Sequence, residues 1–187
     1  CGGIISQQVN RGAQVEVWSF FTADPPVDKL TAFARILHRR WGQTGSPYGL
    51  RRAEDEAAGN FLGVRTRHFG HPDCIYRYYD SDNSPLVRKT ADLFKPVREP
   101  ETNLEDTLWS ELQMNLHPDD RIILPLGAGG HIDHLLIRNI GARLPNEKTY
   151  YPDFPYSGKL KSISELGMPA GAVPTRFDLT DEDIHRW

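Results

Sequence analysis

Two histidines and an aspartate lie close together in the segment Gly130-His131-Ile132-Asp133-His134. The segment follows a short apolar run of the kind that forms buried parallel strands, and a helical pattern comes after it. In open α/β sheets, ligands bind at this carboxyl edge of the strands. The two imidazoles can therefore share one metal-facing pocket: one ligates the ion, the other faces substrate, and the carboxylate holds a ring nitrogen in the right tautomer.

The same three residues also fit a purely structural role. His131 can cap the helix that follows, and His134 can be a half-buried surface histidine. Asp133 can simply favour the positive N-terminus of that helix. The glycine-rich loop at residues 127–130 leaves room for a ligand near the backbone. Spacing alone leaves both interpretations open.

Strand and helix patterns alternate along the chain and must position this segment. β-branched, aromatic or wholly apolar runs predict strands at residues 15–21, 64–69, 122–124 and 148–151. Apolar residues at helical spacing predict helices at residues 28–41, 50–62, 103–116 and 136–144. Asp28 and Asn103 are the expected N-caps, and a further helical pattern runs from Leu179 to Trp187. This order predicts an α/β fold with a mainly parallel sheet and helices on both faces.

A polar segment with several prolines interrupts the alternation at residues 78–100. We expect a long loop there, with a short helix around residues 87–94. Long loops in compact domains tend to be functional, so this one is a candidate for substrate specificity.

The composition limits the class of protein. A chain of 187 residues suits one domain with its own core, and 22 basic against 25 acidic residues give a net charge of −3. The basic residues are spread out, so nucleic acid is not expected as a partner. No apolar stretch approaches the roughly 18 residues that span a bilayer. Cys1 and Cys74 form at most one disulfide, which favours a reducing, cytoplasmic location.

Four segments of the chain resemble the LmbE-like/PIG-L family of zinc-dependent de-N-acetylases. The stretch from Pro125 to His134 resembles the HxDH motif of that family, and Cys1-Gly2-Gly3-Ile4-Ile5 resembles the residues that follow its first motif. The other two are Arg51-Arg52-Ala53-Glu54 with Leu62-Gly63, and Tyr150-Tyr151-Pro152-Asp153-Phe154-Pro155-Tyr156. Together they cover nearly the whole chain in the family's order.

The resemblance implies a Rossmann-like three-layer α/β/α fold and hydrolysis of the N-acetyl group of an N-acetylglucosamine-type sugar or glycoconjugate. It implies Zn²⁺ as cofactor, with His134 as one ligand. It also implies that His131 stabilises the oxyanion or protonates the leaving amine, and that Asp133 orients it. Arg51 aligns with an arginine that meets a polar sugar or phosphate group, although an arginine on a helix is more often a solvated surface charge.

The family's first motif, His-Pro-Asp-Asp-Glu, supplies the other zinc ligands and the general base, and we expect it to lie before Cys1. The chain is thus expected to be a single deacetylase domain that is truncated at both ends and lacks its first strand. The polypeptide alone would then be poorly stable and inactive. Its oligomeric state and its exact substrate are left open.

Two internal segments echo the first motif. His117-Pro118-Asp119-Asp120 precedes the predicted strand at residues 122–124, whereas His131 follows it, so roughly 15 Å would separate them. Zinc ligands lie within about 2.3 Å of one ion. We therefore interpret 117–120 as a turn, and Gly70-His71-Pro72-Asp73 as a loop whose Asp73 is a weaker candidate for the edge of a substrate pocket.

Two other functions remain open. Cys1 could be an N-terminal nucleophile whose own amine serves as base, as in amidohydrolases that begin with Cys-Gly. Such folds are built on antiparallel sheets, which the β/α alternation opposes. The chain could also be a non-catalytic module that binds sugar without a metal.

Overall fold

The computed structural model describes residues 2–25, 28–42, 47–159 and 167–185. The chain forms two compact units, one made of Cys1–Tyr76 with Val173–Trp187 and the other of Arg77–Ala172. The organisation as a single domain stays a prediction. Cys1 and Trp187, which is the end of the predicted C-terminal helical pattern, lie outside the described residues.

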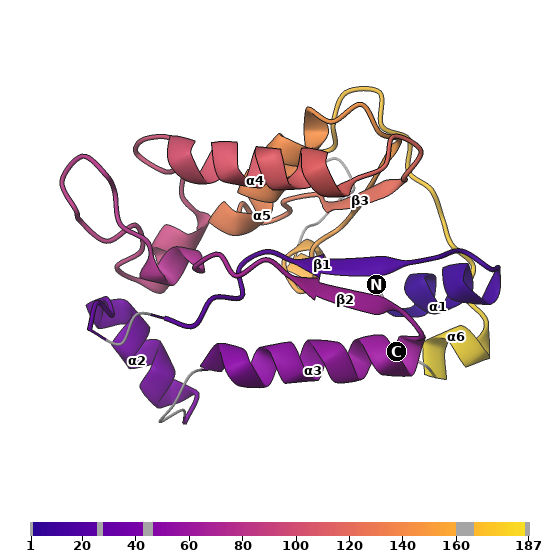
Figure 1. Ribbon diagram of the computed structural model, residues 1–187, viewed down its shortest axis with the longest axis horizontal. Helices are drawn as coiled ribbons and strands as arrows, with labels where there is room; N and C mark the ends of the chain where they lie inside the picture. The colour runs from indigo at the N-terminus through magenta and orange to yellow at the C-terminus, as the bar shows by residue number, and fades with distance from the viewer. Residues whose placement is uncertain (1, 26–27, 43–46, 160–166, 186–187) are drawn as a thin grey trace. The chain divides into compact units, whose positions relative to one another are not determined.

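The first unit is built on two parallel strands and a long helix. Strand β1 (Glu16–Ser19) pairs in parallel with β2 (Arg65–His68), and α3 (Pro47–Leu62) runs alongside them (Figure 1). A β-carbon on Gly59 of α3 would lie 2.5 Å from Thr66 Cγ2. Only glycine allows this close approach of helix to strand. The unit also holds α2 (Ala32–Arg40) and the 3₁₀ helix η1 (Cys74–Tyr76).

The two ends of the described chain meet within the first unit. Helix α1 (Gly2–Asn10) packs against α6 (Asp181–His185) and the residues just before it. Gln7 Nε2 donates a 2.9 Å hydrogen bond to the Asp178 carbonyl. A β-carbon on Gly3 would lie 2.7 Å from Leu179 Cδ1, so the two segments are in tight contact.

The second unit repeats the parallel arrangement. Strand β3 (Ile122–Pro125) pairs in parallel with β4 (Lys148–Tyr151), and α5 (Ile132–Ala142) connects them. Leu124 of β3 packs against Gly141 of α5, where an added β-carbon would lie 2.5 Å from Leu124 Cδ2. Helix α4 (Thr102–Asn115) contacts α5 and buries Leu108 and Leu112. The unit also contains the 3₁₀ helices η2 (Thr90–Phe94) and η3 (Ser157–Lys159).

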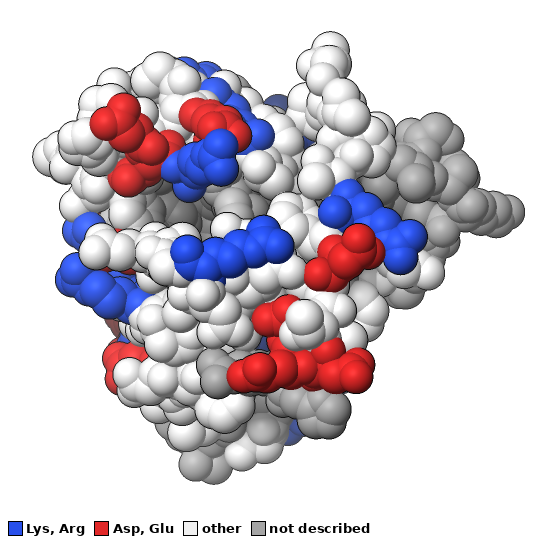
Figure 2. Space-filling model, turned by 90° about the vertical axis from the view of Figure 1, so that its right-hand side faces the viewer, with Lys and Arg blue, Asp and Glu red and all other residues white. Residues whose placement is uncertain are grey.

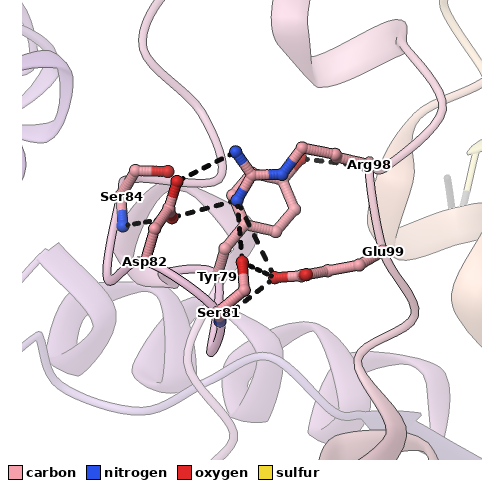
Figure 3. Close-up of polar contacts among 6 residues, drawn as sticks. All are labelled: Tyr79, Ser81, Asp82, Ser84, Arg98 and Glu99. Carbon is pink, nitrogen blue, oxygen red and sulfur yellow. Dashed lines mark hydrogen bonds and ion pairs between the residues drawn. The ribbon is translucent and has the colours of Figure 1, made fainter.

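The long loop at residues 78–100 is tied together by its own side chains (Figure 3). Arg98 donates hydrogen bonds to both carboxylate oxygens of Asp82, at 3.0 and 2.9 Å, and its guanidinium carbon lies 4.1 Å from the centre of the Tyr79 ring. The Ser81 hydroxyl donates to Glu99 at 2.9 Å. The predicted helix at residues 87–94 is present as the shorter 3₁₀ helix η2.

The structure confirms the α/β class, the parallel strands and the predicted order of strands and helices. The boundaries of four predicted helices shift. The N-cap of α2 is Thr31, three residues after Asp28, because the Thr31 hydroxyl accepts from Ala34 N at 3.0 Å. Helix α3 begins at Pro47, since a missing N–H costs nothing in the first turn. Helix α4 begins at Thr102, so Asn103 is not its cap.

The remaining shift is at α5, which begins at Ile132 and ends at Ala142, before Leu144. The segment Gly2–Asn10, for which the sequence pattern indicates no element type, is a helix. The turn at His117-Pro118-Asp119-Asp120 is confirmed: Asp120 Oδ2 accepts from His117 N at 2.7 Å, and the His117 side chain is 71% exposed. Within the described residues, each helix falls short of the length and hydropathy needed to cross a membrane.

Charged side chains of both signs lie interspersed on the face drawn in Figure 2. Among the exposed charged residues of the protein, Arg65 pairs with Glu16 at 3.2 Å and Arg121 pairs with Glu147 at 2.9 Å. Exposed pairs of this kind stabilise a fold by only about 0–1 kcal/mol.

Candidate functional site

The predicted site begins where β3 ends and the chain turns into α5. Gly127, Gly129 and Gly130 all have positive φ, at 78°, 83° and 77°, which L side chains rarely adopt. These glycines form the turn by which the chain passes from β3 into α5. His131 is the N-cap of α5, with φ −60° and ψ 131°, and its Nδ1 accepts from Asp133 N at 3.3 Å. The capping role that the spacing allowed is therefore present.

This cap also sets the tautomer of His131. A ring nitrogen that accepts a hydrogen bond carries a lone pair, so the proton of a neutral His131 ring is on Nε2. In this form the ring can donate a hydrogen bond from Nε2. Capping and a chemical role are therefore compatible in the same side chain.

His134 lies in the first turn of α5 and is held by a carboxylate. Its Nδ1 contacts Oδ1 of Asp153, and the His134 side chain is 34% exposed whereas the Asp153 side chain is 0% exposed. The other carboxylate oxygen accepts from the backbone amides of Gly127 and Ala128, at 2.7 and 2.9 Å. A carboxylate at Nδ1 favours a proton on that nitrogen and leaves Nε2 with a lone pair.

The contacts of Asp153 shift its pKa. Burial raises the pKa of this carboxyl. The hydrogen bond from His134, the charge of His134 and the amides of Ala128 and Gly127 lower it further than burial raises it, so the pKa lies below its ordinary value. The Asp153 side chain is therefore an ionised acceptor that is itself out of contact with solvent.

Asp133 lies in a buried cluster with one arginine and a second acid. Arg77 Nη2 donates to Asp133 Oδ1 at 2.6 Å and to Glu101 Oε2 at 3.1 Å. The side chains of Arg77, Asp133 and Glu101 are 5%, 6% and 14% exposed. Burial raises the pKa of Glu101, Arg77 opposes this shift, and the Asp133 charge adds to it. A carboxylate oxygen of Asp133 also lies within 4.8 Å of a ring nitrogen of His131.

Aromatic rings surround the two histidines. The ring centres of His131 and His134 are 5.0 Å apart. Tyr156 lies 6.2 Å from the first and 6.0 Å from the second, and Phe94 of η2 lies 5.8 Å from His131. Gly129 makes room for Tyr156, because an added β-carbon would lie 2.7 Å from Tyr156 Cβ.

Arg51 lies in the first unit, on α3. Its guanidinium carbon is 5.0 Å from the centre of the Trp41 ring and 5.4 Å from that of Tyr48. It lines a pocket of about 240 Å³ at the end of β1, together with Ser19, Phe21, Thr22, Tyr48, Glu54 and Asp55. The loop at 70–73 is confirmed, and its Asp73 accepts from Tyr48 Oη at 2.6 Å. The pocket thus combines aromatic rings with charged groups of both signs.

Several residues of the site were not assigned a role from the sequence. They are Arg77, Phe94, Glu101, Asp153 and Tyr156. Asp153 follows the end of β4 by two residues, at the carboxyl edge where ligands bind, and that position could have marked it. The other four have no local signal, because their contacts depend on segments far apart in the chain.

Zinc is the metal that the family resemblance implies for this site. Zinc is bound in proteins by neutral imidazole nitrogens, and a metal-binding histidine almost always donates its other N–H to a carboxylate or carbonyl. In its neutral form His134 meets both conditions, because a proton on Nδ1 faces Asp153 and Nε2 then carries a lone pair. The residues present therefore fit a zinc ligand at His134.

The fold and this site define an α/β protein with a histidine-bearing loop at the carboxyl end of a parallel strand. No family model matches the sequence, and no curated protein shows a significant sequence match. Solved structures are similar. The zinc-inhibited form of the teicoplanin deacetylase Orf2 matches 99% of this chain and 74% of its own, with 21% identity and a TM-score of 0.74.

Two further structures extend this likeness. A deacetylase–teicoplanin complex from the teicoplanin biosynthesis pathway matches 99% of this chain and 77% of its own, with 22% identity and a TM-score of 0.74. The A40926 pseudoaglycone deacetylase Dbv21 matches 99% and 71%, with 22% identity and a TM-score of 0.71. At such identities the likeness establishes the fold, and function has to be argued from the site.

Proposed function

We propose that this chain carries the HxDH side of the active site of a zinc-dependent N-deacetylase of the LmbE-like/PIG-L type. The single observation that carries the proposal is His134, whose Nδ1 is held by buried Asp153 while His131 stands beside it on the same helix. The fold shared with three deacetylase structures supports the same reaction class.

Each residue of this segment has a chemical task in amide hydrolysis. His134 presents Nε2 to the metal. The Nε2–H of His131 donates to the oxygen that becomes negative as water attacks the amide carbonyl, the kind of contact that stabilises such transition states strongly. Asp133 is fixed by its hydrogen bond from Arg77. It lies at the same helix terminus, where its backbone N–H donates to Nδ1 of His131 and so orients that ring. A zinc ion bound here would supply Lewis-acid polarisation of the carbonyl and a more acidic water.

The proposed substrate is an N-acetylglucosamine-type sugar, free or as part of a glycoconjugate. The rings of Tyr156 and Phe94 beside His131 offer apolar faces of the kind that pack against sugar rings. In the first unit, Arg51 and the two acids Glu54 and Asp55 line a pocket with donors and acceptors for hydroxyl groups. Both features favour a hydroxylated ligand over a purely apolar one.

Two alternatives differ in what they require. A nucleophile at Cys1 belongs with antiparallel sheets, whereas both strand pairs here are parallel. A sugar-binding module without metal would not need a carboxylate on His134 Nδ1. The first alternative is opposed by the fold and the second by the geometry of the histidine.

The test is zinc binding and acetate release by the polypeptide that carries both this chain and the first motif, with three histidine variants. His134→Ala should lose zinc and activity together. His131→Ala should keep zinc but lose about 10²–10³ in kcat, the usual effect of removing one oxyanion donor. The matched control is His117→Ala, because His117 lies exposed in the 117–120 turn.

The outcomes separate the models. If His134→Ala retains zinc and full turnover, the proposed metal role is wrong. If His117→Ala abolishes activity, the 117–120 segment is the first motif after all.

A further inference from the structure

The β3–β4 ladder ends just before the site. Its last paired residues are Pro125 and Tyr151, and the last backbone bond is Leu126 N to the Tyr151 carbonyl at 2.9 Å. Beyond this point Gly127 turns into positive φ and the two chains separate. The next backbone amides therefore need other acceptors, because buried N–H groups are rarely left unpaired.

A side chain takes over where the ladder stops. Continuing the same register by two residues places Asp153 opposite Gly127. One oxygen of Asp153 accepts both the Gly127 and the Ala128 amide, at 2.7 and 2.9 Å. Ala128 is 3% exposed and Asp153 is 1% exposed, so water does not compete for these bonds.

The second oxygen of the same carboxylate is directed at His134. Because Oδ2 is committed to the loop amides, the carboxylate cannot rotate without breaking two buried hydrogen bonds. Oδ1 is then fixed on His134 Nδ1. One side chain thereby connects three elements: the end of β4, the glycine loop and the first turn of α5.

We propose that Asp153 is a positioning residue that holds His134 in the Nδ1–H tautomer and aims its Nε2 at the metal. This inference rests on the proposed zinc function only in naming zinc as the ion that Nε2 would bind. The tautomer and the coupling to the loop hold without any metal.

The substitution Asp153→Asn isolates the tautomer. The two amide donors of Gly127 and Ala128 require an oxygen, so the side-chain carbonyl of Asn must face them. Its NH₂ group then faces His134 Nδ1 and forces that nitrogen to accept. The ring proton of His134 moves to Nε2, so this nitrogen no longer has a lone pair with which to bind a metal. The size of the side chain at position 153 stays the same.

The experiment is ¹⁵N NMR of the imidazole nitrogens in metal-free protein, followed by zinc titration. The chain has seven histidines, and the His134 signals are assigned by their loss in His134→Gln. Wild-type protein should show Nδ1–H at His134, and Asp153→Asn should show Nε2–H. Zinc affinity should fall by about 10–100-fold in Asp153→Asn, the usual effect of removing a carboxylate behind a metal-bound histidine.

The control is Asp119→Asn, an acid-to-amide change at a side chain that is 92% exposed in the 117–120 turn. It should leave the tautomer and the zinc affinity of the protein unchanged. A second variant, Asp153→Ala, removes the acceptor of both loop amides and should speed hydrogen exchange at Gly127 and Ala128 without altering exchange in the first unit.

The failure of this inference can be told from the failure of the proposed function. A wild-type His134 with its proton on Nε2, or an unchanged tautomer in Asp153→Asn, overturns the positioning role whatever the metal does. If the tautomer switches as expected but wild-type protein that carries the first motif binds no zinc, the positioning role stands and the zinc function falls. The wild-type spectrum shows which ring nitrogen of His134 carries the proton, so it tests the positioning role even if a variant fails to fold.

Discussion

Arg77 and Asp133 form a buried ion pair, with Arg77 Nη2 at 2.6 Å from Asp133 Oδ1. Glu101 shares the same guanidinium nitrogen at 3.1 Å. One cation thus compensates two carboxylates whose side chains are only 6% and 14% exposed. Replacing Arg77 by Ala leaves both acids without it, and we expect the free energy of unfolding to drop by about 3–5 kcal/mol. Urea denaturation measures this difference.

The matched comparison is Arg98→Ala in the same unit. Arg98 pairs with Asp82, but both side chains are about half exposed, so its loss should change the unfolding free energy by no more than about 1 kcal/mol. Equal effects of the two variants would show that the buried cluster is not a special source of stability. Glu101→Gln should be the mildest change in the cluster, because burial already raises the pKa of Glu101 towards its neutral form.

Three glycines allow backbone strain to be separated from steric contact at the site. Gly158→Ala adds a methyl group in open space without positive φ, and we expect a change within about 0.5 kcal/mol. Gly171 has φ +78° and also open space around it, so Gly171→Ala should lower the free energy of unfolding by about 1–2 kcal/mol through backbone strain alone. Gly129→Ala adds contact with Tyr156 at 2.7 Å and should cost about 1–3 kcal/mol more.

Thermal or urea unfolding of the three variants gives the ranking. The order Gly158, Gly171, Gly129 is the expected one, from the smallest loss to the largest. If Gly129→Ala loses no more stability than Gly171→Ala, Tyr156 shifts at little cost to relieve the contact with its Cβ. The aromatic residues around His131 would then be loosely packed.

The elements that sequence analysis predicted well are those whose signal is local. The apolar run of β3 and the helical stripe of α5 depend on residues within one element, and both are present. The loop between them places His131, Asp133 and His134 together for the same reason. Helix α1 lacked such a signal, because Gly2 and Gly3 disfavour helix in isolation and the helix packs on the C-terminal segment.

The partners of the site residues were beyond the reach of local patterns. Asp133 meets Arg77 across 56 residues of sequence, and His134 meets Asp153 across 19. An aspartate after a strand is common in turns and loops, so only the folded chain shows which one a histidine contacts. The predicted N-cap of α2 was wrong for a related reason. Asp28 and Thr31 are both residue types that suit an N-cap, and the hydrogen bond from Thr31 to the distant Ile75 carbonyl favours Thr31.

Three of the seven tyrosines should resist ionisation and make the fold sensitive to alkali. Burial raises the pKa of Tyr151 to about 12, and the charge of Asp153 adds to the shift. Burial also raises the pKa of Tyr48 and Tyr76, with Asp73 as a further cause. A raised pKa means that the folded state favours the neutral phenol, so this stability is complete below pH 10 and declines as pH rises through 12.

Absorbance of tyrosinate near 295 nm, followed with pH, measures the effect. We expect part of the signal to appear only together with unfolding. Tyr151→Phe should reduce the loss of stability between pH 10 and 12, whereas it should not alter stability at pH 7 through titration. Complete ionisation of all seven tyrosines before the protein unfolds would contradict the burial of these rings.

Arg98 ties together the loop at residues 78–100 (Figure 3). Arg98 contacts Asp82 and Ser81 and covers the Tyr79 ring, and Asp82 in turn accepts from Ser84 N at 3.0 Å. Because these bonds lie at the surface, Arg98→Ala should leave global stability almost unchanged but speed hydrogen exchange of the amides at residues 79–84 several-fold.

Arg121→Ala is the control for this loop, since Arg121 is also exposed and paired, with Glu147, at the start of β3. It should leave exchange at residues 79–84 as in the wild type. Unchanged exchange in Arg98→Ala would mean that the backbone bonds of Tyr79, at 2.9 Å to both Ser84 and Asn83, are enough to hold the loop. Faster exchange only in that variant would show that a single arginine orders the segment in which substrate specificity was expected.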